Sequence, residues 1–147
     1  MSLTLKGFSL IELMIVIAIM SIILGFAYPS YQAYIVRAHR IEGQMALFDL
    51  ANRMEKYYDH YATYANAAIE TGTAYDVLRQ RQTTQGWYEL SIIMATDDHF
   101  IVQATPTRGQ ATQDHWCQTL RLNDQGEQSI AAGPGGHPSA TWADCWS

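Results

Sequence analysis

The sequence has little positive charge, and it lacks the short motifs that usually mark a catalytic centre. Lys and Arg together number 9 against 14 Asp and Glu, which gives a formal net charge of −5. A general nucleic-acid-binding protein usually has the opposite balance. The sequence contains no phosphate-binding loop, no dinucleotide fingerprint and no nucleophile elbow. We therefore expect a protein that is not an enzyme and that needs no cofactor.

Metal-binding patterns are also scarce. The five histidines are scattered, and none has a spacing that would bring a second ligand from the same helix. His115 and Cys117 resemble half of a metal site. A cysteine in a disulfide offers no thiolate to a metal, so we expect no metal centre if Cys117 is paired.

Only two cysteines are present, Cys117 and Cys145, and both lie in the last third of the chain. An even count in an exported domain is most simply explained by one disulfide. That disulfide would close a loop of about 29 residues and stabilise the fold by roughly 3.5 kcal/mol. The alternative is two buried free thiols in a reducing compartment, and the cysteines alone leave it open.

The apolar residues are concentrated near the start of the chain. From Phe8 to Tyr28 only Ser9, Glu12 and Ser21 are polar. As a helix, this segment would be about 31 Å long, enough to cross the hydrocarbon core of a bilayer. Apolar residues occupy every face, whereas a helix in a soluble core normally has a polar stripe. The segment is therefore predicted to span a membrane and to be retained, because no good signal-peptide cleavage site follows it.

The residues around the start of the apolar run form a specific motif. Residues 6–13, KGFSLIEL, combine a glycine, a bulky apolar residue, a hydroxyl residue, two aliphatic residues and a glutamate. This segment resembles the prepilin motif of type IV pilins and of type II secretion pseudopilins. The resemblance implies that a prepilin peptidase cuts after Gly7 and methylates the new N-terminal residue, Phe8. The chain would then comprise a leader at 1–7, a membrane and filament-core segment at 8–28, and a head at 29–147.

Glu12 is an ionisable residue inside the predicted membrane helix. A carboxylate at this depth costs a few kcal/mol, so it is by default a functional residue. Glu12 lies one helical turn beyond Phe8, and it could simply pair with the terminal amine of its own chain. The resemblance implies a second role, in which Glu12 attracts the Phe8 amine of a neighbouring subunit and sets the register of assembly.

Pro29 follows the apolar run without ending the helical pattern. Proline removes one backbone hydrogen bond and usually bends the helix axis. We expect a helix from Phe8 to about Tyr61, kinked at Pro29 with Gly25 beside it. In filaments of the resembling family this stretch is often unwound, and the sequence leaves its state open.

Beyond Pro29 the helical pattern has two apolar stripes. The first stripe would face neighbouring subunits, and it comprises Tyr31, Ile35, Ala38, Ile41, Met45 and Phe48. The second stripe would face the head of the same chain, and it comprises Leu47, Leu50, Met54, Tyr57 and Tyr61.

The remainder of the chain predicts a small sheet. Residues 62–86 have no clear period and are predicted to be a connecting loop, with room for one helical turn. Four strand-like segments follow, at 88–94, 100–106, 117–123 and 127–132. Turns are expected at 97–98 and at 123–126, where Gly126 suits a positive φ. The tail at 133–147 is rich in Gly and Pro and is predicted to have no regular structure. The fold class is therefore α+β, with the helix packed on a four-stranded antiparallel sheet and one C-terminal disulfide.

The ending Cys145-Trp146 and the strand motifs most resemble the PilE-like branch of type IVa pilins. This resemblance implies a structural pilus subunit, and we expect a minor pilin involved in pilus biogenesis. Alternatives are a major pilin and a type II secretion pseudopilin. The implied partners are other pilin subunits, prepilin peptidase and an inner-membrane assembly platform. The implied location is the bacterial inner membrane with the head in the periplasm, and then the extracellular pilus, which could serve adhesion or twitching motility.

A further alternative is a pilin that binds DNA during natural transformation. The residues that would approach one another in the head are Arg79, Arg81, Arg108 and Arg121, with Trp116, Trp142 and Trp146 for stacking. The acidic balance of the chain argues against this function.

Overall fold

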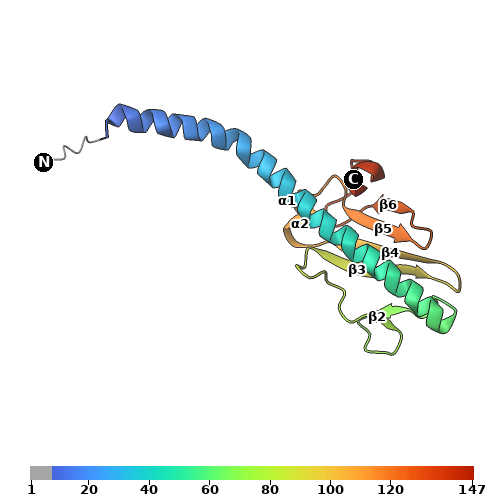
Figure 1. Cartoon of the computed structure of the whole chain (residues 1–147). Helices are drawn as coiled ribbons and strands as arrows, with labels where there is room; N and C mark the ends of the chain where they lie inside the picture. Colours follow the sequence, from blue (N-terminus) through green and yellow to red (C-terminus); the bar gives the residue numbers. More distant parts are fainter. Residues whose placement is uncertain (1–7) are drawn as a thin grey trace, which may run out of the picture. The chain divides into compact units, whose positions relative to one another are not determined.

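The computed structural model describes residues 8–147 (Figure 1). The predicted leader at 1–7, with Gly7, lies outside the described residues. The chain divides into two compact units, one ending at Ile35 and the other formed by Val36–Ser147. The second unit is called the head below.

Helix α1, Leu10–Tyr61, begins in the first unit. Before Pro29 its large apolar side chains are exposed on every face, and the helix is long and apolar enough to cross a membrane. The helix continues through Pro29, as predicted. Because proline has no N–H, the carbonyl group of Gly25 loses its usual donor at this point. The predicted kink at Pro29 stays a prediction.

The second apolar stripe of α1 forms one side of the head's core. Leu47, Leu50 and Met54 are fully buried, and Tyr57 is nearly so. Their spacing of three or four residues places them on one face of the helix, as predicted. Tyr61 differs from this pattern because the helix ends there, and its ring remains 38% exposed beside the rings of Tyr57 and Tyr75.

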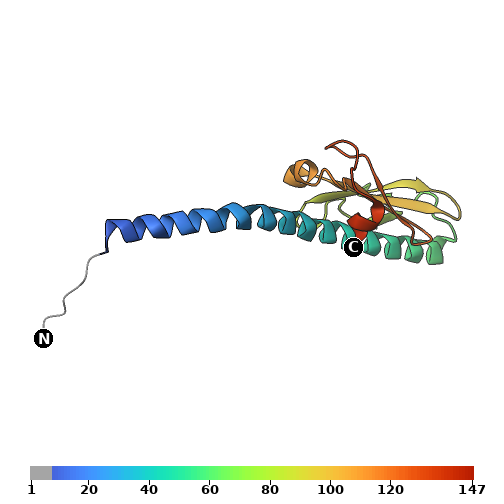
Figure 2. The same cartoon turned by 90° about the horizontal axis from the view of Figure 1, so that it is seen from above.

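Four antiparallel strands form the other side of the core, in the order β3-β4-β5-β6. They are β3 (Tyr88–Ala95), β4 (Phe100–Pro106), β5 (Thr119–Asn123) and β6 (Gln128–Ala131). Alternate residues of β4 are buried under α1, beginning with Phe100 and Val102. Figures 1 and 2 show the head part of α1 lying along one face of this sheet. The predicted α+β fold, a long helix packed on a four-stranded antiparallel sheet, is confirmed.

The strands are joined by turns where the sequence predicts them. Gly126 has a φ of 76°, and its N–H donates to the carbonyl group of Asn123. The side-chain oxygen of Asn123 accepts hydrogen bonds from the N–H groups of Gln125 and Glu127. This local bonding fixes the loop between β5 and β6.

Two segments differ from the predictions. The connection at 62–86 contains two short parallel strands, β1 (Ala68–Ile69) and β2 (Asp76–Leu78), which are too short to produce a recognisable period. The tail does contain regular structure, helix α3 (Trp142–Trp146). Thr141 and Asp144 form a capping box at its start, so a local signal outweighs the Gly and Pro content of the tail.

The C-terminal region is tied to the sheet by a disulfide. Cys117 and Cys145 are bonded, with their Cα atoms 5.6 Å apart. The bond joins α3 to Cys117, which lies just before β5, and excludes the free-thiol alternative. A further short helix that the sequence analysis did not predict, α2 (Arg108–Gln113), follows β4.

Candidate functional site

Residues 79–86 lie along the edge of the sheet beside β3. The carbonyl group of Arg81 accepts from the N–H of Leu90 at 2.6 Å, and the N–H of Thr83 donates to the carbonyl group of Tyr88 at 3.0 Å. The N–H of Gln85 donates to the Glu42 carboxylate on α1 at 2.9 Å. These bonds cover the edge of β3 and hold the segment in a defined conformation.

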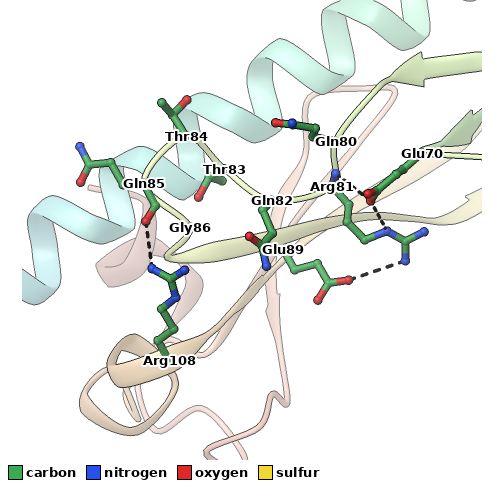
Figure 3. A pocket seen from close by; sticks show the side chains of 10 residues that line it. All are labelled: Glu70, Gln80, Arg81, Gln82, Thr83, Thr84, Gln85, Gly86, Glu89 and Arg108. Carbon is green, nitrogen blue, oxygen red and sulfur yellow. Dashed lines mark hydrogen bonds and ion pairs between the residues drawn. The ribbon is translucent and has the colours of Figure 1, made fainter.

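This segment borders an open, polar hollow of about 680 Å³ (Figure 3). Most of its lining is uncharged and capable of hydrogen bonding. The lining residues are Glu70, Gln80, Arg81, Gln82, Thr83, Thr84, Gln85, Gly86, Glu89 and Arg108. Glutamine and arginine side chains are the groups that read the edges of adenine and guanine in DNA.

Arg81 is held between two carboxylates in this hollow (Figure 3). Its Nε donates to Oε2 of Glu70 at 3.1 Å, and its Nη1 lies 3.7 Å from Oε1 of Glu89. All three side chains are about half exposed. The three charges sum to −1, so this cluster does not attract a phosphate group by charge alone.

Arg108 borders the hollow at the start of α2. It takes no part in the ion pairs found among residues 8–147. Its Nη1 donates to the carbonyl group of Gln85 at 3.5 Å. A Cβ at Gly86 would lie only 3.2 Å from Nη2, so the glycine allows this close approach. Arg108 therefore presents an uncompensated positive charge at the rim.

The four predicted arginines do not form one cluster. Arg81 and Arg108 line the hollow just described, whereas Arg121 lies on the sheet face turned away from α1, where its Nε donates to Gln103 at 2.9 Å. Arg121 and Trp142 line a second hollow of about 570 Å³. Arg79 is exposed and lines neither.

The other predicted tryptophans are separate from both hollows. Trp116 is 58% exposed beside His115, and Trp146 donates from Nε1 to the carbonyl group of Ser129. Trp142 is therefore the one predicted tryptophan that lines the same hollow as a predicted arginine, Arg121. In the part of the chain that the structure describes, no three His, Cys, Asp or Glu side chains form a metal site.

A buried polar network that the sequence analysis missed lies between α1 and α2. Gln110 is fully buried, and its Nε2 donates to the Tyr88 hydroxyl group and to the Val36 carbonyl group, both at 3.1 Å. His39 lies 3.1 Å from Oε1 of Gln110, and its ring stacks on Trp87 at 3.8 Å. Burial raises the pKa of the Tyr88 hydroxyl group, so it stays neutral. No sequence spacing links residues so far apart in the chain.

A protein-family comparison decides the assignment of the chain. Residues 29–121, more than half of the chain, match the family described as "Type IV minor pilin ComP, DNA uptake sequence receptor". The chain belongs to the ComP family of type IV minor pilins. Residues 6–28 also match the prokaryotic N-terminal methylation motif, which agrees with the prepilin motif in the sequence. This ComP-family chain is thus a non-enzymatic type IV pilus component with a hydrophobic N-terminal helix.

The ComP-family chain is also similar to major pilins. It is 36% identical over 104 residues to the type IV major fimbrial protein FimA of Dichelobacter nodosus strain VCS1703A. That match covers 69% of this chain and 59% of FimA. Other FimA proteins of Dichelobacter nodosus are 58% identical over 38 residues, which is 26% of this chain and 24% of theirs. The matched part thus spans about a quarter of the length of these latter relatives.

Among solved structures, the non-core minor pilin PilV of Neisseria meningitidis has a similar fold. The TM-score is 0.51 with 21% sequence identity, and the match covers 73% of this chain and 97% of PilV. This likeness shows the fold of the ComP-family chain and nothing more specific.

Proposed function

We propose that this minor pilin binds DNA at the surface of a type IV pilus and so serves natural transformation. The observation that carries the proposal is the match of residues 29–121 to a family described as a DNA uptake sequence receptor. All four arginines considered for DNA binding lie within that stretch. The family description supports this alternative better than the expectation of a PilE-like biogenesis subunit.

The arrangement of charge supports DNA binding in spite of the net charge of −5. DNA meets a local surface, and phosphate contacts come from individual Arg and Lys side chains. Arg79, at the start of the segment 79–86, and Arg108, beside Gln85 near its end, are both exposed, and neither belongs to an ion pair within the described residues. These two side chains are the proposed phosphate contacts. Arg121 and Trp142 form a separate place where a nucleotide would meet a guanidinium group and an exposed indole.

In this proposal, the N-terminal segment determines how the chain is processed and assembled into the filament. Prepilin peptidase removes the leader after Gly7 and methylates Phe8, and residues 8–28 then anchor the chain in the inner membrane with the head in the periplasm. An assembly platform transfers the subunit into an extracellular pilus of like and unlike pilins. Glu12, which is exposed in the first turn of α1, pairs with the Phe8 amine of a neighbouring subunit. An unpaired carboxylate among packed apolar helices is costly, so this pairing sets the axial register.

DNA binding is tested with the mature full-length chain in detergent micelles and a 30-bp duplex of random sequence. We expect a gel shift at low salt, with the logarithm of the affinity falling linearly with the logarithm of the salt concentration. The variant R108Q should weaken binding and lower the slope by about one. The matched control is R53Q, because Arg53 is an exposed arginine on α1 paired with Asp49 and far in sequence from the proposed surface. Absence of any shift at low salt would refute the proposal.

A role in the filament is tested separately by counting subunits. Mass spectrometry of sheared, purified pili should find this chain as a small fraction of the total pilin, because a receptor is not the main building material. A majority share would instead favour a major pilin, the class to which the FimA relatives belong.

A further inference from the structure

Resting on the proposed DNA-binding function, we propose that the hollow beside residues 79–86 reads base edges, and that Arg81 is its specificity-determining residue. In this proposal Arg81 does not act as a phosphate contact. Glu70 and Glu89 restrain its guanidinium group and offset its charge, which suppresses binding to DNA of arbitrary sequence.

The first argument concerns the charge of Arg81. Glu70 and Glu89 approach Nε and Nη1 from two sides and give the three groups a net charge of −1 (Figure 3). A phosphate group brought to this cluster would meet two carboxylates for one cation, and like charges at this range repel. A guanine edge carries no net charge, so it avoids that penalty. The cluster thus disfavours backbone contacts and tolerates base contacts.

The second argument concerns geometry. The Arg81 carbonyl group is bonded to Leu90 and the Arg81 N–H lies 3.3 Å from Oε2 of Glu70, so the residue is fixed at both main-chain and side-chain level. Within the described residues neither Nη1 nor Nη2 of Arg81 makes a hydrogen bond, and Nη1 approaches the Glu89 carboxylate only at 3.7 Å. The outer end of the fork is therefore free to donate to the O6 and N7 acceptors of guanine, which an arginine contacts in a bidentate manner. A restrained fork loses less rotamer entropy on binding than a free one.

The third argument concerns the rest of the lining. Gln80, Gln82 and Gln85 line the same hollow as Arg81, and a glutamine amide pairs with the N6 and N7 groups of adenine. Thr83 is buried and its hydroxyl oxygen accepts from the Tyr88 N–H, so it supports the segment without facing a ligand. A surface that only neutralises phosphates would be expected to carry more cations here than Arg108 at the rim. The chemistry of the hollow is that of base recognition in duplex DNA.

The test begins with selection by the mature full-length chain in detergent micelles. The probe is a pool of 30-bp duplexes with a randomised centre, and retained duplexes are sequenced. Affinities are then measured for the most enriched duplex and for the unselected pool. The wild-type chain should enrich particular sequences and bind the enriched duplex at least about tenfold more tightly than the pool.

The decisive variant is R81K, which keeps the charge and removes the fork. We expect a loss of about 5-fold to 100-fold for the enriched duplex and a change of less than about threefold for the pool. R108Q should weaken binding to the enriched duplex and binding to the pool to a similar extent. The matched control for R81K is R53K, because Arg53 forms a comparable exposed ion pair with Asp49. A second variant, Q80A, probes the same hollow at an exposed side chain and should change the preferred bases.

The role of the two carboxylates is tested with E70Q/E89Q. Removing both negative charges should tighten binding to the pool several-fold and make that binding more dependent on salt. The ratio of the affinity for the enriched duplex to the affinity for the pool should therefore become smaller. The control D49N/D59N removes two negative charges from α1 and should leave the preference unchanged. Thermal unfolding of each variant verifies that the fold is retained, as expected for half-exposed side chains.

The outcomes separate the two proposals. If the wild-type chain binds the pool but enriches nothing, or if R81K and Q80A keep the full preference, base reading at this hollow is wrong and DNA binding stands. If E70Q/E89Q does not tighten binding to the pool, the filtering role of the carboxylates is wrong. If the wild-type chain binds no duplex at low salt, the proposed function itself fails.

Discussion

Arg40 donates two parallel hydrogen bonds to the carboxylate of Asp114, from Nε to Oδ2 at 3.0 Å and from Nη2 to Oδ1 at 2.8 Å. Asp114 is 1% exposed and Arg40 12% exposed at their side chains, so the pair is nearly dry. The two residues join α1 to the C-terminal end of α2, beside the buried Gln110. This ion pair positions the helix that carries Arg108.

Removing one partner of this pair should be costly. The variant R40A leaves the Asp114 carboxylate buried without its partner, and we expect a loss of about 3–5 kcal/mol in the free energy of unfolding. Urea unfolding of the mature chain in micelles measures the loss. The double variant R40A/D114A should cost less than the sum of the two single variants. If the loss in the double variant equals the sum of the losses in R40A and D114A, the two residues do not interact directly.

Gly43 is required by the ring of Tyr88. A Cβ at position 43 would lie 3.0 Å from two ring atoms, closer than normal packing allows. Alanine is favoured over glycine in a helix by about 1 kcal/mol, yet we expect G43A to destabilise the head by about 1–3 kcal/mol because the ring must move. The control is G109A, where the added Cβ would lie 3.6 Å from its nearest atom. A stabilised G43A variant would show that the ring shifts freely.

The disulfide between Cys117 and Cys145 should contribute strongly to the stability of the head. The two cysteines are 28 residues apart in the chain. By the loop-closure estimate, the variant C117A/C145A should lose roughly 3.5 kcal/mol, and its melting temperature should not respond to dithiothreitol. Wild-type protein treated with dithiothreitol should approach the melting temperature of the variant. A wild-type protein that is equally stable with and without dithiothreitol would contradict this expectation.

His99 and Asp124 link the two turns at one end of the sheet, with Nδ1 and Oδ2 2.9 Å apart. The hydrogen bond to Asp124 and the charge of that carboxylate raise the pKa of His99 above its ordinary value of 6.5. Partial burial, the largest single influence, raises the pKa of Asp124, but the hydrogen bond and charge of His99 together with backbone hydrogen bonds outweigh it, and the net pKa lies below 3.8. The stability from His99 is complete below about pH 6.5 and is lost as the pH rises through the raised pKa. The stability from Asp124 is present above about pH 3.8 and is lost as the pH falls through the lowered pKa.

The pair should therefore stabilise the head most between about pH 4 and 6.5. An NMR titration of His99 measures its pKa directly. In D124N the pKa of His99 should fall towards 6.5, and in the control D98N it should fall less, since Asp98 acts only through its charge. A larger fall in D98N than in D124N would contradict the assignment.

Local sequence patterns determined the long helix and the four-stranded sheet of this protein. The apolar run from Phe8 to Tyr28 could be predicted as a membrane helix without the tertiary structure, because a helix of this length with no polar face is stable in a lipid bilayer. The buried stripe that begins at Leu47 and the alternation in β4 follow from the 3.6-residue and two-residue periods. With only two cysteines, Cys117 and Cys145 were the one pair that could form an intrachain disulfide, and the structure showed that the bond is formed. The capping box of Thr141 and Asp144 was also present in the sequence, but the nearby glycines and prolines obscured it.

The tertiary structure alone decided which polar side chains meet. Arg81 contacts Glu70 and Glu89 because the segment 79–86 runs beside β3, and no periodicity in the sequence records that position. Arg40 and Asp114 are likewise brought together across 74 positions by the packing of α2 against α1. Local patterns reflect backbone geometry over a few residues, whereas ion pairs between distant segments depend on how whole elements pack. For this reason the sequence could name the arginines, but only the fold could show which of them is held in an ion pair and which makes none among the described residues.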